Sequence, residues 1–123
     1  MANFTYYNRN PYGVEITDCV CRAISLGTGL SYNATYRLLN RVSNIYKCEK
    51  LCSCCYNYLL KDLLGYKRYV CKNGELVEDI AKQYPNSKVI IRIEQHLTVS
   101  MYGKVADIWD CSEKKVDCYW IVS

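Results

Sequence analysis

Two cysteines lie where a helix is expected to begin. Cys19 and Cys21 directly follow Asp18, a good N-cap residue. The unpaired amides and positive dipole end of a helix lower the pKa of a thiol in its first turn, which favours the nucleophilic thiolate. Cysteine also packs well as a small apolar residue. Cys19 is nearer the helix tip, but helical angles place both thiols beside the buried stripe, so both are candidate nucleophiles.

The chain contains a single histidine, His96. Most lone histidines are structural, but the position of this one favours a chemical role. In a strand, His96 shares a face with Thr98 and Ser100, and the apolar residues of the segment occupy the opposite face. The imidazole is therefore expected on the polar face, at the start of its strand.

Two acids follow on the next predicted strand, Asp107 and Asp110. If the loop at Tyr102 and Gly103 has two residues, Asp107 becomes the diagonal neighbour of His96, with Cβ atoms roughly 7 Å apart. A three-residue loop would make Asp110 the partner instead, and we favour Asp107. A thiol on a helix tip, a histidine and an acid form a nucleophile–base–orienter set, in which the imidazole takes the thiol proton and the carboxylate holds the ring.

The helices that must position these groups come first in the chain. A polar and aromatic segment with a turn at Pro11 and Gly13 precedes them. Residues 18–27 predict a helix with one buried stripe, and Ser31 is expected to cap a second helix over 32–46. The stripe consists of Val20, Ala23, Ile24 and Gly27. Further helical segments are expected at 52–65 and 75–84.

After Pro85 the apolar residues alternate, which is typical of strands. The pattern predicts a short strand at 66–70 and four more, at 88–94, 96–102, 104–110 and 117–122. Helices followed by strands predict an α+β fold, with N-terminal helices packed on a C-terminal antiparallel β-sheet. A chain of 123 residues is expected to form a single domain over residues 1–123.

Composition limits the function classes. The net charge is only +4, and the basic residues are scattered among acids, so no specific nucleic-acid partner is expected. No signal peptide and no membrane-spanning stretch is recognisable, and no membrane partner is expected. Nine cysteines without an export signal favour a reduced, intracellular chain. The 13 tyrosines, with abundant Asn, Ile and Lys, suggest an AT-rich genome, such as that of a low-GC bacterium or its phage.

A second group of cysteines suggests a different chemistry. Four thiols lie within eight residues, at Cys48, Cys52, Cys54 and Cys55. Four thiolates are a ligand set for structural zinc, although two C-x2-C pairs separated by a long spacer, as in zinc knuckles, are absent. On a helix, three of the four would share one face and pack as small apolar groups. We favour packing and expect no cofactor, with zinc as the alternative.

The sequence resembles the papain-like cysteine peptidases, in which an N-terminal helix carries the Cys and a later sheet carries His and then Asn or Asp. "DIWD" is similar to the Asn-Ser-Trp-Gly block of that family, which implies an orienting role for Asp107 and a covering role for Trp109. "DCVCRAIS" and "HLTVSMYGKVADIWD" also resemble small uncharacterised phage and prophage proteins with an Asp-Cys-x-x-Arg-Ala helix. Because their Cys follows the Asp, this resemblance supports Cys19 with Asp18 beside it.

The resemblance implies a minimal papain-like fold and a thiol hydrolase, catalysed by Cys19, His96 and Asp107, that cleaves a peptide or isopeptide bond through an acyl-enzyme. Papain-like enzymes carry a Gln six residues before the Cys, where this chain has Gly13. The candidate oxyanion donors are therefore Asn8, Asn10 and Gln95. A peptide or protein substrate is expected, in the host cytoplasm or the phage virion. The alternative is a non-catalytic papain-like virion or host-interaction protein that binds partners through its tyrosines.

Overall fold

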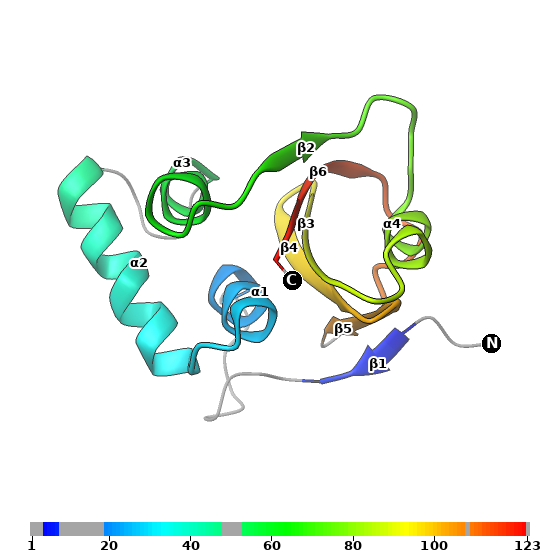
Figure 1. Cartoon of the computed structure of the whole chain (residues 1–123), viewed down its shortest axis with the longest axis horizontal. Helices are drawn as coiled ribbons and strands as arrows, with labels where there is room; N and C mark the ends of the chain where they lie inside the picture. Colours follow the sequence, from blue (N-terminus) through cyan, green and yellow to red (C-terminus); the bar gives the residue numbers. More distant parts are fainter. Residues whose placement is uncertain (1–3, 8–18, 48–52, 108, 123) are drawn as a thin grey trace.

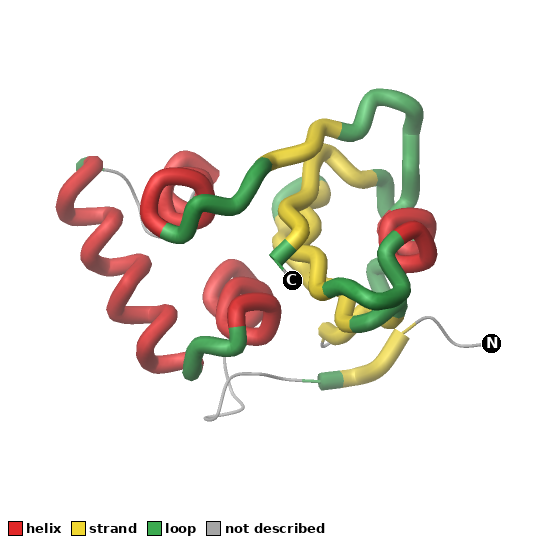
Figure 2. The backbone as a smooth tube through the Cα atoms, in the orientation of Figure 1, coloured by secondary structure: helices red, strands yellow, loops and turns green. Residues whose placement is uncertain are grey.

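A computed structural model describes residues 4–7, 19–47, 53–107 and 109–122. In these residues the chain forms an α+β fold, with helices α1 to α3 on one side of a six-stranded sheet and α4 on the other (Figure 1). The tube view separates the helices from the strands of the sheet (Figure 2), and most of the helices precede most of the strands in the sequence. The predicted fold class is confirmed. None of the described helices is long and apolar enough to cross a membrane.

The helices follow the predicted segments closely. α1 spans Cys19–Thr28, α2 spans Tyr32–Tyr46, α3 spans Ser53–Asn57 and continues as a π-helical segment, η1, over Tyr58–Leu63, and α4 spans Val77–Gln83. Ser31 caps α2 as predicted, because its hydroxyl accepts a hydrogen bond from the Ala34 amide. The predicted cap of α1, Asp18, lies outside the described residues.

Six strands form the sheet in the order β1-β5-β4-β3-β6-β2. Their bounds are Phe4–Tyr6 for β1, Arg68–Val70 for β2, Lys88–Ile93 for β3, His96–Met101 for β4, Lys104–Asp107 for β5 and Val116–Ile121 for β6. All neighbours are antiparallel except β1, which runs parallel to β5 at the edge. The sequence did not predict β1, because this short edge strand is mostly exposed and shows no apolar alternation.

The β4–β5 hairpin settles the register on which the site depends. Met101 pairs with Lys104, so the loop consists of the two residues Tyr102 and Gly103, as predicted. Both have positive φ, at 54° and 90°, which is the pattern of a type I′ turn. This register places Asp107 on the same face as His96.

Helix α1 lies against β4 and β3 at unusually close range. Its predicted stripe is buried, with exposures of 0–4% for Val20, Ala23 and Ile24. A Cβ added at Gly27 would lie 2.7 Å from Cγ1 of Ile90 on β3, so glycine is required for this approach. The close packing holds the first turn of α1 next to the start of β4.

Candidate active site

Cys19 is the first residue of α1 and is half-buried. It lines a cavity of about 240 Å³, together with Tyr56, Arg92, Gln95 and His96. Leu97 also lines this cavity. Burial alone would raise the pKa of Cys19, but its interactions with the His96 side chain and the Leu97 backbone, and the positive charges of His96 and Arg22, lower the pKa below its ordinary value.

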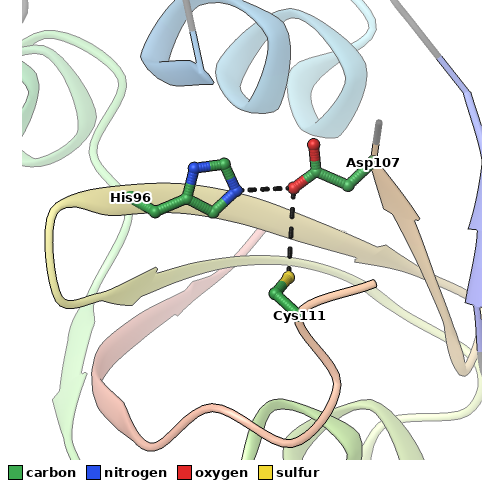
Figure 3. A group of neighbouring side chains, drawn as sticks. All are labelled: His96, Asp107 and Cys111. Carbon is green, nitrogen blue, oxygen red and sulfur yellow. Dashed lines mark hydrogen bonds and ion pairs between the residues drawn. The ribbon is translucent and has the colours of Figure 1, made fainter. Parts of the chain in front are cut away.

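His96, the first residue of β4, links the thiol to the acid. Its Nε2 lies 2.7 Å from Oδ2 of Asp107, and its side chain is only 10% exposed. Figure 3 shows the second ring nitrogen, Nδ1, on the side of the imidazole away from the carboxylate. Burial opposes the charged ring, but hydrogen bonds to Asp107, Cys111 and Cys19 raise the pKa of His96 to about 11.

Asp107, the last residue of β5, is buried and held by several groups. Its Oδ2 also accepts a hydrogen bond of 2.7 Å from the Thr98 hydroxyl, and the Arg22 guanidinium lies 3.6 Å from its Oδ1. The alternative acid, Asp110, is exposed and accepts hydrogen bonds from the Ser112 amide and hydroxyl instead. The structure therefore pairs Asp107 with the histidine, and Asp110 belongs to a turn.

A second thiol, Cys111, lies beside His96 and Asp107, and the sequence did not predict it there. Its Sγ is 4.0 Å from Oδ2 of Asp107 (Figure 3) and within 4.8 Å of a ring nitrogen of His96. Cys111 is fully buried and follows the end of β5 in a loop. Strand alternation does not extend into a loop, so no sequence pattern pointed to this contact.

His96, Asp107 and Cys111 are also the only group of possible metal ligands within the described part of the chain. Their ligand atoms lie within 4.8 Å of one another. These ligand types suit zinc, but the same carboxylate already accepts a hydrogen bond from Thr98 and faces the charge of Arg22. A cation would have to displace these contacts, so the arrangement fits an orienting acid better than a metal ligand.

The remaining predicted residues have different outcomes. The Trp109 ring lies 5.0 Å from the His96 ring and is 40% exposed, so it covers one side of the imidazole. Gln95 has a positive φ of 57° and lines the cavity beside Cys19, which is where an oxyanion donor would be needed. The other two candidate donors, Asn8 and Asn10, lie outside the described residues.

The structure distinguishes Cys19 from Cys21. Cys21 is 1% exposed and its thiol donates to the carbonyl oxygen of Tyr32, so it packs between α1 and α2. In the cysteine-rich segment, Cys55 is likewise buried and donates to the Leu39 carbonyl. Cys48, Cys52 and the side chain of Cys54 lie outside the described residues, and the zinc alternative there stays a hypothesis.

Comparison with known proteins adds no family assignment. No protein-family model, no curated protein and no solved structure matches this chain. The functional argument therefore depends on the geometry of the chain itself.

Proposed function

We propose that this protein is a thiol hydrolase of papain-like type that cleaves a peptide or isopeptide bond through an acyl-enzyme. One observation carries the proposal. The Cys19 thiol at the start of α1 lines the same cavity as His96, and Nε2 of that ring lies 2.7 Å from Oδ2 of the buried Asp107. A candidate nucleophile, base and orienting acid therefore lie together at one site.

The two pKa shifts support the same charge state. The pKa of Cys19 is lowered and that of His96 is raised to about 11, so proton transfer from thiol to imidazole is favoured near neutral pH. The product is a thiolate next to an imidazolium, which is the reactive state of a cysteine nucleophile. The hydrogen bond from Thr98 and the ion pair with Arg22 fix the carboxylate that orients the ring.

The reaction follows from these positions. The Cys19 thiolate attacks the carbonyl carbon of the scissile amide and forms a C–S bond, giving a tetrahedral oxyanion. When the C–N bond breaks, the His96 imidazolium gives its proton to the leaving amine and a thioester is left on Cys19. His96 then takes a proton from water, whose oxygen attacks the thioester. The carboxylic acid leaves, and the Cys19 thiolate and the imidazolium are restored.

Two donors are available for the oxyanion. The backbone amide of Cys19 lies in the first turn of α1, where amides have no partner within the helix. The Gln95 side chain lines the same cavity and can supply a second N–H. Gln95 belongs to the two-residue loop between β3 and β4, so it would approach the substrate from the sheet.

The arrangement of elements supports the papain-like assignment. A helix that begins with the nucleophile packs on a largely antiparallel sheet whose adjacent strands carry the base and the acid. This is the order expected from the resemblance of the sequence to papain-like peptidases. A phage or prophage origin, with a host or virion protein as substrate, is part of the same proposal.

Selective alkylation tests the proposed function. At about pH 6, iodoacetamide should modify Cys19 on the order of 100-fold faster than an ordinary thiol, because an ordinary thiol is almost entirely protonated there. The sites of modification are identified by mass spectrometry of the labelled protein. His96→Ala should remove the advantage of Cys19. Equal reaction of all nine cysteines would exclude a thiolate–imidazolium pair.

A non-catalytic role in binding is the second candidate, because the surface is rich in aromatic side chains. Six of the described tyrosines are at least 36% exposed, and Tyr46 stacks on Tyr58 with ring centroids 4.0 Å apart. The six are Tyr6, Tyr7, Tyr36, Tyr46, Tyr58 and Tyr102. Tyrosine is enriched in protein interfaces. A binding protein of this kind would still bind its partners after Cys19→Ala, whereas a hydrolase would no longer form cleavage products.

A further inference from the structure

A guanidinium lies in the same cavity as the proposed nucleophile. Arg92, on β3, pairs with Leu97 of β4, the residue next to His96. Its side chain lines the cavity of about 240 Å³ together with Cys19 and His96. The proposed mechanism gives Arg92 no role in bond breaking. It is therefore free to act on a part of the substrate next to the scissile bond.

The contacts of Arg92 leave most of its hydrogen-bonding capacity available. NH1 lies 4.0 Å from Oδ2 of Asp117, and the two side chains are 32% and 52% exposed, so this ion pair is long and solvated. Tyr56 lines the same cavity as Arg92 and packs edge-on against Trp120. A guanidinium has five N–H donors, and a carboxylate can accept two of them side by side.

The charges around the cavity favour an anion. Among the described residues that line it, none is an aspartate or glutamate, and Arg92 is the permanent cation. Tyr56 stays a neutral phenol, because burial raises its pKa to about 12. It therefore adds no negative charge to the cavity.

We infer that Arg92 binds a carboxylate of the substrate next to the bond that Cys19 attacks. The enzyme would then prefer amide bonds flanked by aspartate or glutamate, or by a free C-terminus. This inference rests on the proposed function, since it names the substrate class of the same site.

A matched pair of alkylating agents tests the inference without a known substrate. Iodoacetate and iodoacetamide have nearly the same size and differ in a carboxylate. The measured quantity is the rate of iodoacetate divided by the rate of iodoacetamide at Cys19. Arg92→Gln should lower this ratio about fivefold, the effect expected when one partly exposed ion pair is lost. Arg92→Lys should keep most of the ratio of the natural chain, because the positive charge remains. Arg68→Gln is the control, because it changes the net charge equally at an exposed residue outside the cavity.

The outcomes separate the two proposals. If Cys19 shows no selective reaction even with iodoacetamide, the proposed function fails and the inference fails with it. If Cys19 is selective but the ratio is the same in Arg92→Gln and Arg68→Gln, only the carboxylate site is excluded. Circular dichroism establishes that each variant is folded.

A second variant tests the same site while keeping Arg92. Asp117→Asn removes the competing carboxylate at an exposed position, so the iodoacetate ratio should rise about twofold. A ratio that stays constant or falls would contradict the inference.

Peptides identify the source of the carboxylate. A peptide library is incubated with the protein, and the products are read by mass spectrometry. Cleavage beside aspartate or glutamate identifies a side-chain carboxylate, and cleavage limited to peptides with a free rather than an amidated C-terminus identifies the terminal group. Equal cleavage beside Asp and Asn, and with free and amidated ends, would exclude the inference.

Discussion

Two thiols lie near the same imidazole, in different regions of the molecule. Cys19 opens onto a cavity at the first turn of α1, whereas Cys111 is fully buried in the loop after β5. Cys19 is near two cationic side chains, and Cys111 lies beside the carboxylate of Asp107. Proximity to a histidine therefore does not by itself define a nucleophile. Access for the electrophile and the sign of the nearby charge distinguish the two thiols.

Exchanging each thiol for a hydroxyl is the sharpest test of this comparison. Cys19→Ser should abolish the fast alkylation at pH 6, a loss on the order of 100-fold, because no activated thiolate is left. Cys111→Ser should leave the rate at Cys19 within about twofold, since the buried thiol does not meet the reagent. The rates come from timed labelling and mass spectrometry. Loss of fast alkylation in Cys111→Ser alone would reverse the roles of the two thiols.

Removing the charge of the shared acid tests what holds the histidine. Asp107→Asn should destabilise the fold by about 3 kcal/mol, because the buried Arg22 loses a carboxylate and His96 loses its charged partner. Alkylation of Cys19 should slow as well. Chemical denaturation measures the stability. Asp110→Asn is the matched control and should cost about 1 kcal/mol or less, because Asp110 is exposed. An equal loss of stability in the two variants would contradict the assigned register.

The raised pKa of His96 predicts how stability depends on pH. The folded state binds this proton more tightly than the unfolded state, whose histidine has a pKa near 6.5. The contribution of His96 to stability is therefore complete below about pH 6.5 and is lost as the pH rises toward the folded value of about 11. Denaturation at several pH values should show that the free energy of unfolding falls less steeply with rising pH in His96→Gln than in the natural chain. Parallel profiles would mean that His96 is not protonated in the folded state.

Removing the aromatic ring that covers the imidazole should have the smallest effect on the alkylation of Cys19. Trp109 is 40% exposed and contacts one side of the His96 ring. Trp109→Ala should admit water to the pair and slow Cys19 alkylation by about twofold to fivefold, an effect of about 1 kcal/mol or less. Trp109→Phe keeps an aromatic cover and should restore most of the rate. An unchanged rate in the alanine variant would mean that the indole does not protect the pair.

Local patterns predicted most of the elements and the partner of the histidine. A two-residue turn at Tyr102 and Gly103 determines the hairpin register, and the register determines which acid faces His96. Both steps involve neighbours in sequence, so they could be derived from residue types. Edge strand β1 and the contact with Cys111 could not be derived in this way. Neither shows an apolar period. β1 pairs with a strand far away in the sequence, and Cys111 lies in a loop, where residue alternation does not predict the direction of a side chain.

The sequence by itself determined the α+β class, the helix that carries Cys19 and the pairing of His96 with Asp107, because these depend on short-range periodicity and turn geometry. Only the tertiary structure decided between Cys19 and Cys21. That choice depends on how α1 is rotated against β4, and the rotation is limited by the close contact of Gly27 with Ile90. The same packing brings Arg92 to the cavity. Contacts of this kind depend on the shapes of surfaces far apart in the chain, which a one-dimensional pattern does not contain.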